Sequence, residues 1–129
     1  MCHQTVSLTA RALEEAGIPT VVMGCAKDIV EYVGVPRFYF SDFPLGNPAG
    51  RPGDPDSQYQ TIKGALALLG SATAPMTTVQ NPLRWPGNGE WKDDFSNVAQ
   101  MSEEEIARRR AEFEKGKEIA KQKREDASA

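Results

Sequence analysis

A helical pattern that runs directly into a buried strand, within the first 23 residues, limits this chain to a few kinds of fold. The helix is predicted by apolar residues that recur close to the helical period: Val6, Leu8, Ala10, Ala12, Leu13 and Ala16. Thr5 or Ser7 can cap its start, and Gly17 can end it in a left-handed conformation. Residues 18–23 are uncharged and rich in β-branched side chains, which is typical of a strand covered on both faces of a parallel sheet. The order of the two elements predicts an α/β fold.

The same pattern repeats further along the chain. A second, short helix is expected at residues 26–33, closed by Gly34, followed by a strand at 35–40 and a helix at about 57–69. The core-facing stripe of that last helix is predicted to be Tyr59, Ile62, Ala65, Leu66 and Leu69. We therefore expect residues 1–70 to form a small parallel sheet with its helices, resembling half of a Rossmann fold.

Two further segments follow this core. Residues 71–101 are rich in proline and aromatic side chains and are expected to form an ordered arm, with at most a short strand near 76–79. The bulky side chains of the arm either cover this domain or fill pockets on another chain, and partner contact is the favoured interpretation. These side chains are Leu83, Trp85, Trp91 and Phe95. Residues 102–129 predict a long, charged and mostly solvated helix, with Ser102 as its N-cap.

The predicted core is small for a free-standing sheet. A chain of 129 residues suggests one domain, but its last segment is almost entirely polar and its middle is rich in proline and glycine. A parallel sheet with so few strands leaves open edges. We therefore expect a larger partner subunit that completes the sheet.

Charge and hydropathy argue against two classes of partner. The formal net charge is −3 at pH 7; residues 1–101 carry seven Lys and Arg against ten Asp and Glu, and residues 102–129 carry eight of each. Nucleic-acid binding needs a concentrated positive face, which neither part provides. No apolar run is long enough to cross a membrane, and the start lacks the pattern of a secretion signal. We expect a cytoplasmic protein that binds neither nucleic acid nor membrane.

Cys2 and His3 fall just ahead of the first predicted helix. Unpaired backbone N–H groups and the helix dipole favour an anion there, including a thiolate, and an adjacent histidine can add to the effect. We therefore expect Cys2 to act as a nucleophile that reacts as a thiolate at neutral pH. His3 is a candidate catalytic partner, although neighbouring side chains in an extended turn often point apart.

Three further candidates lie along the predicted sheet. Cys25 follows the first strand, where open α/β sheets bind ligands, and is either catalytic or a small buried side chain. Arg37 can bind a substrate carboxylate or form a structural ion pair. Asn47, in the proline-rich loop at residues 43–48, can bind substrate together with backbone amides. We predict that Cys2, Cys25, Arg37 and this loop converge on a crevice for a small-molecule substrate.

Two other functions remain open for these residues. Cys2, His3 and Cys25 could bind zinc or copper, with a fourth ligand from Asp28, Asp42, water or a partner. Three ligands without a regular spacing are a weak signal, so no metal or other cofactor is predicted as the main interpretation. The remaining alternative is a non-catalytic subunit whose aromatic arm and terminal helix clamp a catalytic partner.

Three segments at particular separations resemble a known enzyme family. They are Ala-Gly-Ile-Pro-Thr-Val at residues 16–21, Val-Gly-Val-Pro-Arg at 33–37 and Phe-Pro-Leu-Gly-Asn-Pro at 43–48. In sequence and spacing they resemble the carboxyl-terminal part of the selenoprotein B component of glycine, sarcosine, betaine and proline reductases. The likeness covers roughly residues 2–69 and nothing in residues 70–129.

The resemblance implies a reductase whose chemistry is centred on the first turn. In that family a selenocysteine, followed by cysteine, lies ahead of the corresponding helix and attacks a carbon that bears an amino group, with reductive cleavage of the C–N bond. Cys2 falls close to that position, but this chain has no selenocysteine and no second cysteine nearby. A thiolate is the weaker nucleophile, so the bond cleaved could also be C–S or another C–X bond. The resemblance thus implies a small, thiol-dependent subunit of a hetero-oligomeric oxidoreductase, with the family's amino-terminal part supplied by another subunit.

Overall fold

The strands form one small and wholly parallel sheet. In a computed structural model that describes residues 2–94 and 101–128, the strands pair in the order β1-β2-β3. They are β1 (Val22–Gly24), β2 (Arg37–Phe40) and β3 (Thr77–Gln80). Val22 lies opposite Phe38, and Phe38 lies opposite Thr78, so the three strands share one carboxyl edge. The predicted small parallel α/β unit is confirmed.

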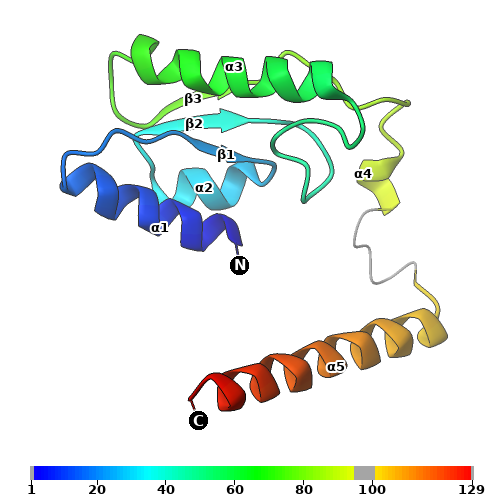
Figure 1. Cartoon of the computed structure of the whole chain (residues 1–129). Coiled ribbons are helices and arrows are strands. Elements are labelled where there is room, and N and C mark those ends of the chain that lie inside the picture. Colours follow the sequence, from blue (N-terminus) through cyan, green and yellow to red (C-terminus); the bar gives the residue numbers. More distant parts are fainter. Residues whose placement is uncertain (1, 95–100, 129) are drawn as a thin grey trace. The chain divides into compact units, whose positions relative to one another are not determined.

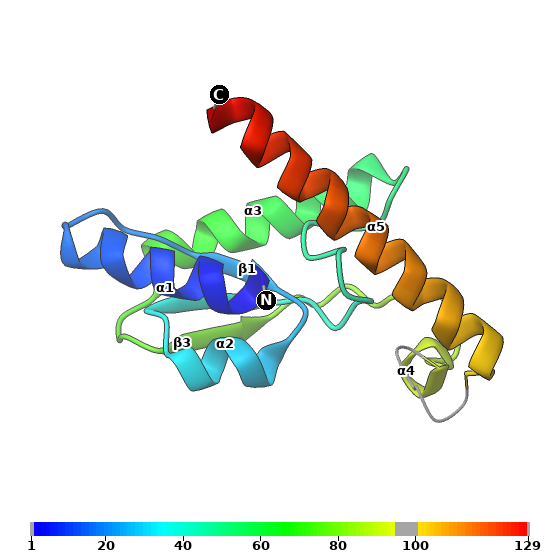
Figure 2. The same ribbon diagram turned by 90° about the horizontal axis from the view of Figure 1, so that it is seen from below.

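Helices cover both faces of this sheet. α1 (Cys2–Glu15) and α2 (Lys27–Val33) lie on one face and α3 (Pro55–Ser71) on the other (Figures 1 and 2). Side chains alternate along β2, so Phe38 faces α1 and α2 whereas Tyr39 faces α3. The first core is made of Ala10, Val22, Val30, Val35 and Phe38, and the second of Tyr39, Ala65 and Leu68. Burial on both faces fits the uncharged Val22 and Met23, but the predicted strand at residues 18–23 begins too early, since β1 starts at Val22 and Ile18 is 50% exposed.

The two crossovers that join the strands have opposite hands. Both step across the sheet in the same direction, from β1 to β2 and from β2 to β3. α2 packs on the Phe38 face and α3 on the Tyr39 face. Two right-handed crossovers in the same direction would place both helices on one face, so one connection has the uncommon left-handed sense. The loop at residues 41–54 is long enough for the chain to change faces.

α1 begins earlier than predicted. It starts at Cys2, so Cys2 and His3 belong to its first turn instead of preceding it. Ser7, one of the expected caps, lies inside the helix, where its hydroxyl donates to the His3 carbonyl at 2.7 Å. Serine and threonine hydroxyls can make this bond to the preceding turn, so a hydroxyl residue near a helix start need not be its cap.

α3 turns a different side to the core than its apolar pattern predicts. Ala65 is buried as predicted, but Tyr59, Ile62 and Leu66 are 69%, 41% and 59% exposed. The buried residues of the helix are Ser57, Thr61, Ala65 and Leu68. Gly64 also faces the sheet, because a Cβ there would lie 2.2 Å from the Tyr39 hydroxyl oxygen. Close approach to Tyr39 and burial of hydroxyl side chains therefore decide the orientation of α3.

The first part of the arm belongs to the same compact unit as the sheet. The chain divides into a unit of residues 1–89 and a unit of residues 90–129. The short strand expected near 76–79 is present as β3. The Trp85 ring lies against Phe43, with the ring centroids 5.4 Å apart, so it covers its own domain and the partner contact favoured for it is not needed. Phe95 lies outside the described residues.

The described part of the second unit contains α4 (Trp91–Asp94) and α5 (Glu103–Ser128). Ser102 caps α5 as predicted, since its hydroxyl accepts the Glu105 N–H at 3.2 Å. Phe113 and Ile119 of α5 are exposed, which agrees with a mostly solvated helix. Across the described parts of both units, no helix combines the length and the apolar character that a membrane crossing requires.

Gly64 and Gly70 of α3 provide a matched test of the helix–sheet packing. Gly64→Ala places a methyl group into the Tyr39 side chain and should destabilise the fold by about 1–3 kcal/mol, the usual cost of overpacking. Gly70→Ala, whose Cβ would meet nothing within 4 Å, should stabilise the helix by up to about 1 kcal/mol. Urea unfolding measures both changes. Equal stability of the two variants would contradict the close approach of α3 to Tyr39.

Candidate functional site

The first turn of α1 lies against the turn that follows β1, at the carboxyl edge of the sheet. His3 Nε2 accepts the backbone N–H groups of Cys25 and Ala26, at 3.1 and 3.3 Å. Gly24 leaves room for the ring, because a Cβ at that position would lie 2.9 Å from His3 Cδ2. The amino end of the first helix and the carboxyl end of the first strand therefore meet as predicted, and His3 links them.

Cys2 joins this arrangement through the other nitrogen of the same ring. Its Sγ lies 3.7 Å from His3 Nδ1, so the two neighbouring side chains do contact each other. Cys2 is exposed, Cys25 is partly buried, and both are free thiols. An exposed thiol, an imidazole and the backbone of a second cysteine thus follow one another along the carboxyl edge.

His3 is neutral in this setting. Burial lowers the pKa of His3, and the charge of Asp28 on α2 acts in the opposite direction. The two N–H donors on Nε2 also require a neutral ring, since a protonated Nε2 could not accept them. Burial and hydrogen bonding therefore both favour a neutral His3 ring.

The proline-rich loop lies beside Cys25, as predicted. Burial raises the pKa of the Cys25 thiol, while the backbone N–H groups of Asn47 and Phe43 act in the opposite direction. The Asn47 side chain is used within the loop, where Nδ2 donates to the Pro44 carbonyl at 3.1 Å. The loop therefore faces Cys25 with backbone amides, and Cys25 is a protonated thiol at neutral pH.

Arg37 lies at the other end of its strand, and the predicted convergence is wrong for this residue. It is the first residue of β2, where its Nη1 donates to Glu14 Oε1 at 2.9 Å. Glu14 also accepts the N–H and the hydroxyl of Thr20. Arg37 is thus half of a structural ion pair, the second of the two roles considered for it. The direction of the strand explains the error, because a residue that opens a strand lies at the amino edge of a parallel sheet.

A buried polar network closes the carboxyl edge, and the sequence analysis missed it. Asn81 Nδ2 donates to Ser41 Oγ at 3.1 Å and to Thr61 Oγ1 at 3.0 Å, while Asn81 Oδ1 accepts the Leu83 N–H. Ser41, Thr61 and Asn81 are almost completely buried. Ser41 Oγ also donates to the Pro48 carbonyl at 3.4 Å, which ties the loop beside Cys25 to this network. The available signal was that Ser41 and Asn81 each follow a strand directly.

The geometry of the described residues offers no ready metal centre. Within residues 2–94 and 101–128, no group of three or more His, Cys, Asp or Glu side chains is placed to hold a metal ion. His3 Nε2 already accepts two N–H groups, and Cys25 meets His3 through its backbone. Zinc or copper at Cys2, His3 and Cys25 would therefore require these side chains to rearrange.

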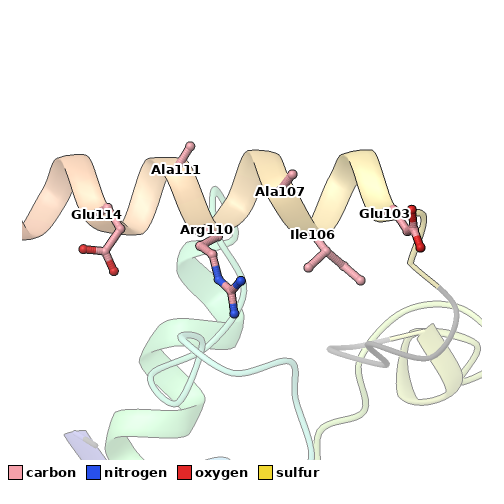
Figure 3. Close-up of a pocket in the computed structure, with 6 residues that line it drawn as sticks. All are labelled: Glu103, Ile106, Ala107, Arg110, Ala111 and Glu114. Carbon is pink, nitrogen blue, oxygen red and sulfur yellow. The ribbon is translucent and has the colours of Figure 1, made fainter.

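Two sizeable hollows lie away from the cysteines. One of about 590 Å³ is at the amino edge of the sheet and is lined by residues that include Gly34, Pro36 and Met76. The other, of about 460 Å³, follows one side of α5 and is drawn in Figure 3. Its lining residues are Glu103, Ile106, Ala107, Arg110, Ala111 and Glu114, all from that one helix. One helix cannot enclose a small molecule, so this hollow is an open groove. Neither hollow is lined by a cysteine or histidine, so we take the cluster at the carboxyl edge as the candidate site.

A curated relative carries a related sequence. This chain is 37% identical over 68 residues to D-proline reductase subunit gamma from Acetoanaerobium sticklandii. The chain is similar to a proline reductase subunit. The match covers 53% of this chain and 28% of the relative, so the chain spans less than a third of the relative's length. No family model matches the chain, and no solved structure matches it. The similarity supports the relation to proline reductases that the sequence segments indicate, but not the selenoprotein B component in particular.

Asn81 is expected to stabilise the whole carboxyl edge. Asn81→Ala should cost about 2–3 kcal/mol, because the Leu83 N–H loses its acceptor and two buried hydroxyls lose a donor. Gln80→Ala, at the exposed neighbouring position, is the control and should change stability by less than about 0.5 kcal/mol. Chemical denaturation of the variants measures this. An Asn81→Ala protein as stable as the wild type would show that the network contributes nothing.

Glu14 should make the fold acid-sensitive. Hydrogen bonds from Thr20, with Arg37 nearby, lower the pKa of Glu14 below its ordinary value of 4.5. The resulting stabilisation is fully present above that ordinary value and is lost as the pH falls through the lower pKa of the folded state. Glu14→Gln should therefore flatten the fall in melting temperature between about pH 5 and pH 3. Glu15→Gln, at the exposed neighbouring position, should leave the profile unchanged. Superimposable profiles for Glu14→Gln and the wild type would exclude this role for Glu14.

Proposed function

We propose that this chain is the thiol-bearing subunit of a hetero-oligomeric reductase that cleaves a C–N bond, or a related C–S or C–X bond, in a small substrate. The observation that carries the proposal is the contact between Cys2 Sγ and His3 Nδ1 in the exposed first turn of α1. A helix start favours a thiolate. The similarity to D-proline reductase subunit gamma supports the same class of reaction.

The proposed chemistry is displacement at carbon followed by reduction. The Cys2 thiolate supplies the electron pair for a new C–S bond while the C–N bond breaks, and the nitrogen leaves with that bond's electron pair and takes up a proton. A second thiol then attacks Cys2 Sγ, so that a disulfide forms and the carbon takes the C–S electron pair and a proton. The substrate gains two electrons and two protons, and two thiols become a disulfide. An external dithiol or a cysteine of the partner supplies the second thiol and restores Cys2.

This chemistry restricts the substrate class. When the C–S bond breaks, the carbon keeps the electron pair of that bond. The negative charge that develops on the carbon must be stabilised by an electron-withdrawing neighbour such as a carboxyl group. Amino and imino acids meet this requirement, and D-proline, which the relative's name contains, is the first substrate to test. We assign substrate contacts to Asn47, whose side chain would exchange its bond to the Pro44 carbonyl for the substrate, and to the backbone N–H groups of the non-proline residues in the loop at 43–48. Cys25 is a supporting group in this proposal, because burial raises the pKa of its thiol.

A larger partner subunit is part of the proposal. Tyr59, Ile62 and Leu66 expose apolar surface on α3. Within the described residues, β1 and β3 each pair on one side only. Exposed apolar surface and open strand edges are features that protein contacts cover. The relative is named as a subunit, which supports assembly with another chain. Two free thiols fit a reducing compartment, and we propose a cytoplasmic location.

The test compares the two cysteines in the assembled complex. Co-purification with the full chain and mass spectrometry identifies the partner, and the complex is then assayed with D-proline and a dithiol. Cys2→Ser should reduce turnover by about a thousandfold, since serine is a poor nucleophile without a strong base. Cys25→Ser is the matched control and should stay within about tenfold of the wild type. Full turnover by Cys2→Ser would exclude Cys2 as the nucleophile and favour the alternative of a non-catalytic subunit.

A further inference from the structure

The turn after β1 holds His3 in one tautomer, and we infer that His3 acts on Cys2 as a fixed hydrogen-bond donor. The N–H groups of Cys25 and Ala26 donate to Nε2 at 3.1 and 3.3 Å. An atom that accepts these bonds needs a free lone pair, so Nε2 carries no proton. In a neutral imidazole the proton then sits on Nδ1, and Nδ1 is the atom 3.7 Å from Cys2 Sγ.

This tautomer decides how His3 can assist the thiol. Nδ1 already holds a proton, so it cannot take the proton of Cys2 as a general base would. The nitrogen that could accept a proton is committed to the two backbone amides. Nδ1 can instead donate its N–H to sulfur, and a hydrogen bond to a charged acceptor favours the thiolate. His3 is thus a positioning residue that orients and stabilises the Cys2 thiolate without exchanging a proton.

Groups around the ring explain why this arrangement is specific. Cys25 and Ala26 directly precede α2, and the His3 imidazole gives their backbone N–H groups an acceptor. Gly24 lies against the ring, where any Cβ would come within 2.9 Å of His3 Cδ2. Asp28 is the charged group of α2 that acts on the ring. The imidazole is therefore held by the backbone of two elements beyond its own.

The tautomer can be observed directly. His3 is the sole histidine of the 129 residues, so its ring nitrogens need no further assignment. Long-range 1H–15N correlation spectra of the full chain near neutral pH should show the proton on Nδ1 and none on Nε2. Gly24→Ala should return the averaged pattern of an unrestrained ring, because its methyl group displaces the imidazole. A proton on Nε2, or averaged nitrogens in the wild type, would overturn the inference.

Two variants of His3 distinguish the acceptor role of Nε2 from the donor role of Nδ1. Glutamine can place an acceptor near the position of Nε2 but has no donor near Nδ1, whereas asparagine has a donor near Nδ1 but does not reach the amides. Iodoacetamide alkylation of Cys2, measured on its own peptide by mass spectrometry, should slow by about 3- to 10-fold in His3→Gln. The melting temperature of His3→Gln should stay within about 2 °C of the wild type, and that of His3→Asn should fall by more.

The alkylation result also separates this inference from the proposed function, on which the use of the donor in catalysis rests. Unchanged alkylation in a folded His3→Gln protein, together with loss of turnover in Cys2→Ser, would reject the donor role and keep the reductase. Slowed alkylation together with full turnover in Cys2→Ser would keep the donor role and reject the nucleophile. If His3→Gln does not fold, the spectra of the wild-type chain still decide the tautomer.

Discussion

Polar groups at the carboxyl edge of a three-stranded sheet need partners, and this requirement shapes most of the first unit. The N–H groups after β1 donate to His3, which brings the start of α1 to that edge. The Ser41 N–H donates to the Gly24 carbonyl at 2.9 Å, and the Asn81 N–H to the Phe40 carbonyl at 2.7 Å. The Asn81 side chain then joins the ends of β2 and β3 to α3. Beside the apolar contact of Phe43 with Trp85, these hydrogen bonds fix how the elements meet at this edge.

The same hydrogen bonds also organise the candidate site. The ring that completes the turn after β1 is the ring that contacts Cys2 Sγ. Ser41 belongs to the buried network and also holds the Pro48 carbonyl of the loop beside Cys25. Fold and site are therefore built from shared contacts, which is how a small unit can position a reactive group with little additional structure. A change that displaces the whole His3 ring is therefore expected to affect stability and reactivity together.

The distribution of apolar residues explains why we assign this chain a partner. α3 buries two hydroxyl residues, Ser57 and Thr61, and exposes Tyr59 and Leu66. Such an arrangement gives the isolated unit less hydrophobic stabilisation than its composition would allow. Contact with another subunit would cover the apolar surface of α3 and the open strand edges. The proposed function and the expected stability of the fold thus depend on the same assembly.

The sequence by itself determined the order of α1, β1, α2, β2, α3, β3 and α5, the parallel α/β class, the cap of α5 at Ser102 and the closeness of Cys2 to a helix start. These features depend on residues within a few positions of one another, so periodicity and capping rules detect them. The direction of β2 could also have been used to place Arg37 at the amino edge. Only the tertiary structure decided which side of α3 is buried, which groups His3 contacts and that Asn81 closes a network. Those outcomes depend on residues 20 or more positions apart, such as His3 with Cys25, and on the missing side chain at Gly64, which leaves room for Tyr39. No local pattern encodes such contacts, because they are selected by how whole elements pack.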